Sequence, residues 1–100
     1  MRFSISQTEL LNALTVVQKG ISPRATLPVL SGVFLEARGD EMIFQTTDLE
    51  KSVQFTSAAL VEEEGATVLP GKLFHDIVKN LPDAAVHVEV VDEGAVINCE

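Results

Sequence analysis

Binding of phosphate groups is the chemistry that the basic residues of this chain favour. Lys72 and Lys79 are seven residues apart, a spacing that places both on one side of a helix, with His75 between them. Arg24 follows a Ser-Pro pair and precedes Pro28, which predicts a short, stiffened loop that displays its guanidinium group. Isolated basic residues are also commonly just solvated surface groups, so this pattern alone leaves both interpretations open.

Catalysis and metal binding find little support in the sequence. His75 and Asp76 would be the best acid/base pair, but adjacent residues on a helix point about 100° apart. Cys99 is the only cysteine, and nothing beside it in the sequence would activate its thiol. One cysteine and two distant histidines do not make a zinc site, and the adjacent carboxylates of 62–64 lack the spacing of calcium ligands. We expect no catalytic residue, metal or cofactor.

The distribution of charge is more informative than its sum. A net charge of −8 opposes binding to nucleic acid. Residues 7–24 and 71–80 nevertheless have a net charge of +2, and the remainder of the chain has −10. The charged residues of the two segments are Lys19, Arg24, Lys72, Lys79, Glu9 and Asp76. Phe74, the one aromatic residue of these segments, belongs to an apolar stripe, so we expect no exposed aromatic residue for base stacking. Any nucleic-acid contact should then involve phosphates without base readout.

The composition is typical of one globular domain. The chain has 100 residues, of which 46% are hydrophobic and 22% charged. It contains no apolar run long enough to span a membrane, and its first residues lack a signal-peptide core. A single cysteine cannot form an intrachain disulfide, so we expect a reducing, cytoplasmic setting and no membrane partner.

The first predicted helix covers residues 7–19. Ser6 has the position of an N-cap, with Glu9 at the capping-box spacing, and Gly20 is a candidate C-cap. Its expected apolar stripe is Leu10, Leu11, Leu14 and Val17. Its expected polar face is Thr8, Asn12, Thr15 and Lys19.

A second helix is predicted to open at Pro70-Gly71, and strands account for most of the rest. The apolar stripe of this helix is Leu73, Phe74, Ile77, Val78 and Leu81, and its outer side is Lys72, His75 and Lys79. Strands are expected at 3–5, 29–35, 42–47, 52–60, 66–69, 85–91 and 95–99. Hairpin turns are expected at 38–40 and 92–94, and a solvated acidic loop at 62–65.

This order of elements indicates an internal duplication. Leu10, Leu11 and Leu14 correspond to Leu73, Phe74 and Ile77 at an offset of 63, and residues 33–36 resemble 86–89. We therefore predict an α+β fold made of two strand-helix-strand-strand units, residues 2–60 and 66–99. Their two helices should lie side by side, antiparallel or nearly so, on one face of antiparallel sheets.

The second unit is expected to lack its last strand. An unpaired strand edge with exposed apolar side chains favours pairing with another copy of the chain. The sequence therefore predicts a dimer, or a crystal contact, formed by strand addition at that edge.

Motifs spread over almost all 100 residues carry a resemblance to a known family. In the first half they are residues 1–5, the pair Leu10-Leu11, Arg24 together with residues 26–30, and residues 47–50. In the second half they are residues 65–67 ahead of Pro70, Lys72 together with Phe74, and residues 76–77 and 81–82. In this order and nearly this spacing they resemble the start of the bacterial DNA polymerase III beta subunit, the sliding clamp. The match is to the first of that family's three domains, with the C-terminal end of the domain incomplete.

The resemblance implies a clamp fold and a role in DNA replication. Family members form a homodimeric ring of six similar domains around double-stranded DNA, with helices lining the hole and sheets outside. The ring is a non-catalytic, cytoplasmic processivity factor that tethers a DNA-directed DNA polymerase. By this resemblance Arg24, Lys72 and Lys79 are the DNA-binding residues, and the polymerase and clamp loader bind through domains absent here.

The alternative is a small acidic protein-interaction domain with no nucleic-acid role, whose helices bury against a partner. A basic, polar outer helix face would favour DNA, and an apolar face would favour a partner helix.

Overall fold

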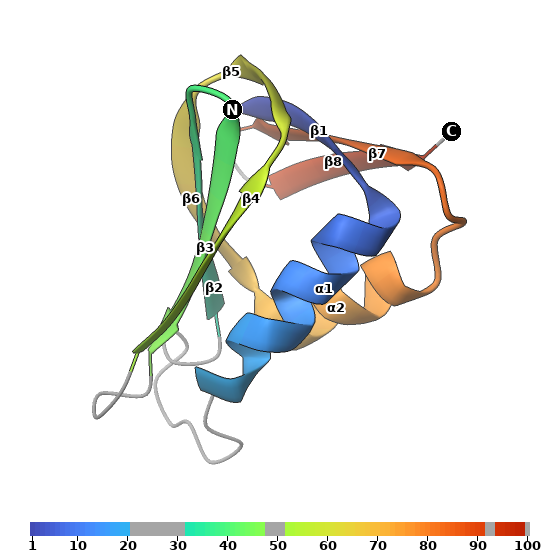
Figure 1. Ribbon diagram of the computed structural model, residues 1–100. Coiled ribbons are helices and arrows are strands. Elements are labelled where there is room, and N and C mark those ends of the chain that lie inside the picture. The colour runs from blue at the N-terminus through green and yellow to red at the C-terminus, as the bar shows by residue number, and fades with distance from the viewer. Residues whose placement is uncertain (21–31, 48–51, 92–93, 100) are drawn as a thin grey trace.

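The computed structural model describes residues 1–20, 32–47, 52–91 and 94–99 of the chain (Figure 1). Their elements are β1 (Arg2–Ser6), α1 (Gln7–Val17), a 3₁₀ turn η1 (Gln18–Gly20), β2 (Gly32–Arg38), β3 (Glu41–Thr47), β4 (Ser52–Ala58), β5 (Leu60–Glu63), β6 (Gly65–Pro70), α2 (Gly71–Lys79), β7 (Ala85–Val91) and β8 (Gly94–Cys99). The start of the predicted strand 29–35, the motif residues 48–50 and Arg24 lie outside the described residues.

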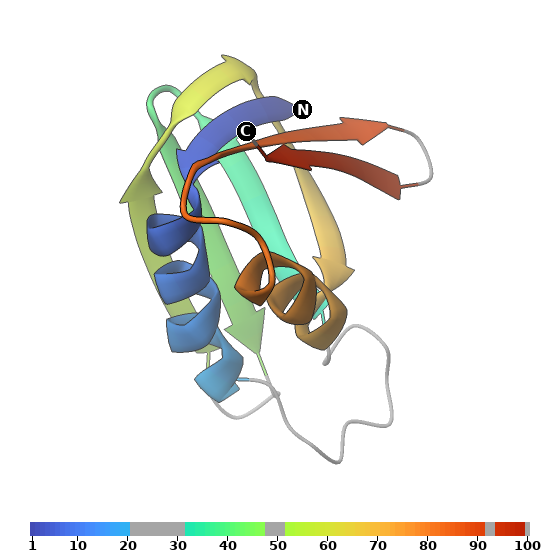
Figure 2. The same cartoon turned by 90° about the vertical axis from the view of Figure 1, so that its right-hand side faces the viewer.

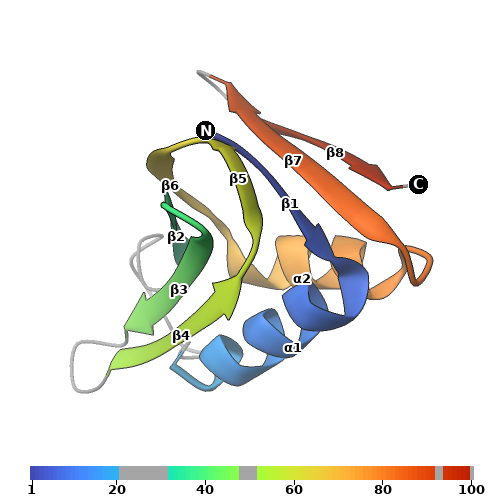
Figure 3. The same ribbon diagram turned by 45° about the horizontal axis from the view of Figure 1, so that its top comes forward.

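The strands form two antiparallel sheets of four, with the orders β5-β1-β7-β8 and β4-β3-β2-β6. The sheets diverge as two sides of a wedge, and both helices close its open side (Figures 1 and 3). The core fills this wedge with alternate residues of the strands, because successive strand residues face opposite sides of a sheet. Its largest fully buried side chains are Phe3, Phe44, Leu10, Leu14, Leu35 and Met42. The α+β prediction with both helices on one face is confirmed.

The duplication is visible in how the strands pair. The units β1-α1-β2-β3 and β6-α2-β7-β8 exchange their first strands, so that β1 pairs with β7 and β6 pairs with β2. The buried Leu10 and Leu14 of α1 correspond to the buried Phe74 and Val78 of α2, an offset of 64. The offset of 63 taken from the sequence was therefore wrong by one residue. Because α2 has adjacent apolar pairs, its pattern could not show which member of each pair faces the core.

The beginning of α1 follows its sequence signals. Ser6 has extended backbone angles, φ −66° and ψ 146°, and its Oγ accepts a hydrogen bond of 3.2 Å from the backbone N–H of Glu9. This confirms the predicted N-cap. At the other end the regular helix stops at Val17, two residues before the predicted end, and the chain continues as a 3₁₀ turn to Gly20.

The Ser6 cap supports a first prediction. Replacing Ser6 with alanine should lower the free energy of unfolding by about 1 kcal/mol, because the N–H of Glu9 loses its acceptor. Urea denaturation followed by circular dichroism measures this change. Ser6→Asp is the matched control, since its carboxylate can cap the same N–H, and equal loss of stability in both variants would contradict the capping role.

The acidic segment after β4 differs from the expectation. The predicted loop 62–65 begins instead as strand: β4 ends at Ala58, and β5, which begins at Leu60, pairs with β1, with Val61 opposite Phe3. Here Val61 packs against the core while Glu62 and Glu63 remain exposed at the sheet edge, with Glu62 Oε2 3.2 Å from Arg2 Nε. An edge strand tolerates such carboxylates, since they do not enter the core.

The hairpin between β2 and β3 confirms the turn expected at 38–40. Gly39 has a φ of +61°, a conformation that glycine adopts without steric strain. Neither α1 nor α2 is long and apolar enough to cross a membrane, and the described part of the chain has no other α-helix.

Candidate nucleic-acid interface

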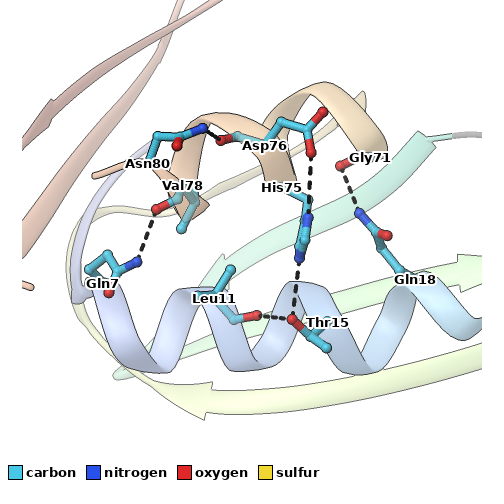
Figure 4. Close-up of polar contacts among 9 residues, drawn as sticks. All are labelled: Gln7, Leu11, Thr15, Gln18, Gly71, His75, Asp76, Val78 and Asn80. Atoms are coloured by element: carbon cyan, nitrogen blue, oxygen red, sulfur yellow. Dashed lines mark hydrogen bonds and ion pairs between the residues drawn. The ribbon is translucent and has the colours of Figure 1, made fainter. Parts of the chain in front are cut away.

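Helices α1 and α2 lie side by side and antiparallel, as predicted (Figure 4). At one end the Gln7 side-chain Nε2 donates a buried hydrogen bond of 3.0 Å to the carbonyl oxygen of Val78. At the other end Gln18 Nε2 lies 3.4 Å from the carbonyl oxygen of Gly71. These two bonds join the start of each helix to the end of the other and fix their relative register.

His75 links the middle of the two helices (Figure 4). The hydroxyl of Thr15 donates a 2.8 Å hydrogen bond to the carbonyl oxygen of Leu11, so its oxygen is left to accept from His75 Nε2 at 3.3 Å. His75 Nδ1 is 3.8 Å from Asp76 Oδ1, which is beyond hydrogen-bond distance. The two side chains are close enough for an ion-pair contact but too far apart for the hydrogen bond that an acid/base pair needs. The contacts give His75 a structural role between the helices.

The outer side of this helix pair is polar. All four residues predicted for the polar face of α1 are exposed, and on α2 Lys72, Asp76 and Lys79 are exposed while His75 is half-buried. Neither Lys72 nor Lys79 forms an ion pair with another described residue, so both ammonium groups face solvent. Asp76 lies between them on the same side of α2 and weakens their combined field.

This geometry is suited to phosphate contacts rather than to chemistry. The described residues contain no group of histidine, cysteine, aspartate or glutamate side chains that could hold a metal ion. A lysine ammonium group is a mobile point charge that meets a phosphate without a fixed direction. The structure thus places Lys72 and Lys79 on one exposed side of α2. Lys19 is exposed in η1, the turn that follows α1, and Arg24 is outside the described residues.

The two glutamines that join the helices were not predicted. Gln7 is buried although it is polar, and it belongs to the first turn of α1. Its burial depends on a carbonyl group 71 residues further along the chain, and no local pattern in the sequence signals that contact.

Comparison with known proteins identifies the family. Residues 1–100 match the family described as the DNA polymerase III beta subunit, N-terminal domain. The chain belongs to this family.

Curated relatives agree with that assignment. The chain is 36% identical over 101 residues to the beta sliding clamp of Staphylococcus epidermidis, an alignment that covers 93% of this chain and 27% of the relative. It is 33% identical to the beta sliding clamp homolog GriR of Streptomyces muensis, over 100% of this chain and 27% of that protein. The chain thus spans about a quarter of the length of these relatives.

Solved beta-subunit structures have the same fold. The structure of Caulobacter crescentus pol III beta superimposes with a TM-score of 0.95 at 34% identity, over 100% of this chain and 27% of that one. The DNA polymerase sliding clamp of Bacillus subtilis gives a TM-score of 0.94 at 29% identity, over 100% of this chain and 29% of that one. The beta-subunit resemblance and the clamp fold expected from the sequence are both confirmed.

Proposed function

We propose that this domain forms part of a DNA sliding clamp, a ring that encircles duplex DNA and tethers a replicative polymerase as its processivity factor. The observation that carries the proposal is the polar outer face of α1 and α2 in a beta-subunit domain, with Lys72 and Lys79 exposed and without an ion pair to any described residue. In this role the domain catalyses nothing itself and acts in the cytoplasm.

The charge distribution fits a protein that must slide. Few, mobile phosphate contacts hold the helix face near DNA without a preferred register, because each lysine can exchange one phosphate for the next. The strongly acidic remainder of the chain, with a net charge of −10 outside residues 7–24 and 71–80, repels DNA from the other surfaces. We infer that Arg24, Lys72 and Lys79 are the DNA-facing residues.

Membership of the family supports a proposal for the wider assembly. We infer that the domain acts within a homodimeric ring whose remaining domains bind the polymerase and the clamp loader. The alternative, an acidic protein-interaction domain, needs an apolar outer helix face, whereas this face carries threonine, asparagine, lysine and histidine. That alternative is not favoured.

Topological retention on DNA tests the proposed function. A chimaeric ring, in which residues 1–100 replace the matching segment of the Bacillus subtilis clamp, is loaded onto nicked circular duplex DNA. We expect the ring to stay on circular DNA during gel filtration and to leave after a restriction enzyme linearises the circle. The unmodified Bacillus clamp, tested in the same way, is the control. A dimeric, folded chimaera that leaves circular and linear DNA equally fast would contradict encirclement.

A further inference from the structure

His75 is the one histidine among the described residues of the two helices, which lie side by side below β7 and β8 in Figure 2. Histidine is the side-chain type that gains and loses a charge between about pH 5 and 8. Only 20% of the His75 side chain is exposed, because its ring lies against α1. A charge that comes and goes with pH is therefore held at a defined place in the polar helix face.

The contacts of the His75 ring determine which nitrogen can take up a proton. The Thr15 hydroxyl proton is used in the bond to the carbonyl oxygen of Leu11, so His75 Nε2 donates to the Thr15 oxygen at 3.3 Å. A neutral imidazole ring carries one N–H, which leaves Nδ1 as an acceptor. Nδ1 is 3.8 Å from Asp76 Oδ1, so two acceptor atoms face each other. A proton on Nδ1 turns this contact into an ion pair.

Asp76 is the residue through which this proton affects the helix face. It lies four residues after Lys72 and three before Lys79, so its carboxylate shares one side of α2 with both ammonium groups. With a neutral His75 ring, this carboxylate repels the phosphates that the two lysines attract. A positive ring offsets the carboxylate and leaves the charge of both lysines unopposed on this side of α2.

The charged groups around the ring couple its protonation to bound phosphates. Those of α2 and of the facing α1 and η1 are Lys72, Asp76, Lys79, Glu9 and Lys19. The three lysines repel a positive ring, whereas the two acids and the phosphates of bound DNA attract it. If bound DNA favours the proton, then by reciprocity the proton favours bound DNA.

The strands packed against α2 add little to this balance. They are β2 and β6, and β6 has no charged residue. Glu36 and Arg38 of β2 lie four and six residues beyond Gly32, which pairs with Pro70 at the start of α2. The charge at His75 is thus controlled by the helix pair and by what binds to it.

We propose that His75 makes DNA binding by this helix face proton-linked. A proton from solvent binds Nδ1, the ring pairs with Asp76, and Lys72 and Lys79 then hold phosphates more tightly. Affinity for DNA should therefore rise as the pH falls. This inference rests on the proposed function, because it assumes that the helix pair faces DNA.

DNA affinity at two pH values tests the linkage. The chimaeric ring is titrated against a short, fluorescently labelled duplex, and binding is followed by anisotropy. At about 50 mM salt we expect binding to be about threefold tighter at about pH 6 than at about pH 8, the effect of roughly one further phosphate contact. This gain should be smaller at about 200 mM salt, which screens exposed charges.

Matched variants of the two histidines assign the effect. His75→Gln keeps an N–H that can reach Thr15 but cannot become charged, so the gain at low pH should be lost. His87 lies in β7 between the buried Val86 and Val88, which places its side chain on the face of the sheet away from the helices. His87→Gln should therefore keep the gain.

The outcomes separate this inference from the proposed function. An equal gain at low pH in the unmodified ring and in His75→Gln would overturn the inference and leave the clamp function standing. So would loss of the gain in His87→Gln alone. A folded, dimeric ring that holds no DNA at either pH would contradict both.

NMR spectroscopy of the 100-residue chain without DNA tests the geometry by itself. At about pH 8 the ring nitrogen shifts of His75 should show the proton on Nε2. Asp76→Asn should move the midpoint of the His75 titration to lower pH, since the positive ring loses its partner, and should leave the midpoint of His87 where it is. A proton on Nδ1 of the neutral ring, or a His75 midpoint that does not move in Asp76→Asn, would overturn the proposal.

Discussion

Replacing Phe74 with alanine is expected to lower the free energy of unfolding by about 3–5 kcal/mol, whereas Leu73→Ala should lower it by less than about 0.5 kcal/mol. Phe74 is 3% exposed and belongs to the core, while its neighbour Leu73 is 59% exposed. Removal of the Phe74 ring leaves a cavity between α2 and the sheets, and removal of the Leu73 side chain leaves only solvent. Urea denaturation at about 5 µM protein, low enough to limit self-association, measures both changes.

Leu10→Ala is the control for this pair. Leu10 is the counterpart of Phe74 at the offset of 64, and its loss should destabilise the domain by about 2–5 kcal/mol. If Leu73→Ala destabilised the domain as much as Phe74→Ala, the offset of 63 would be correct and the orientation of α2 described above would be wrong.

Removing the three charges that we propose to face DNA should make DNA binding much less sensitive to salt. In the chimaeric ring, the triple change of Arg24, Lys72 and Lys79 to alanine removes up to three phosphate contacts, which together contribute about −2.7 to the log–log salt slope. Between 50 and 200 mM salt these contacts account for an affinity change of about 40-fold. Retention on circular DNA, measured by gel filtration across this range, should therefore fall most at the lowest salt concentration.

Thermal unfolding and two single variants control this experiment. The melting temperature should change little, because exposed charges without partners contribute little to stability. Arg38→Ala removes an exposed charge at the β2–β3 turn, away from the helix pair, and should leave retention unchanged. If the triple variant held DNA as long as the unmodified ring at low salt, while Lys19→Ala did not, the assignment of the contact residues would be wrong.

Local signals predicted the elements of this fold well. Ser6 and Glu9 marked the start of α1, and the alternating residues of 52–60 marked a strand, of which 52–58 form β4. β5 was missed because two of its four residues are glutamates, a composition typical of loops, and what makes it a strand is pairing with β1. The burial of α2 was mispredicted for a related reason: Leu73 and Ile77 are apolar but are left uncovered by the rest of the described structure.

The candidate site was predictable only in part. The seven-residue spacing of Lys72 and Lys79 was enough to place both on one exposed side of α2. The bonds that hold this helix against α1 were not predictable, since Gln7 and Gln18 bond to backbone carbonyl groups that any residue type could supply. The side-chain types of α2 thus indicate its basic outer side. The hydrogen bonds that orient α2 against α1 depend on the tertiary fold.

The exchange of first strands between the two units has a consequence for how the chain folds as it is synthesised. All four strands of the sheet β4-β3-β2-β6 come from residues 32–70, so this sheet can assemble early. In the other sheet β1 pairs with β7, with Ile5 opposite Val86, which closes a loop of about 80 residues. On a ribosome, β1 and its apolar residues must wait for β7 to emerge before their central pairing forms. β1 can pair with β5 earlier, but it is among the last of the described strands to have both of its neighbours, and until then the edge that meets β7 is open to a chaperone.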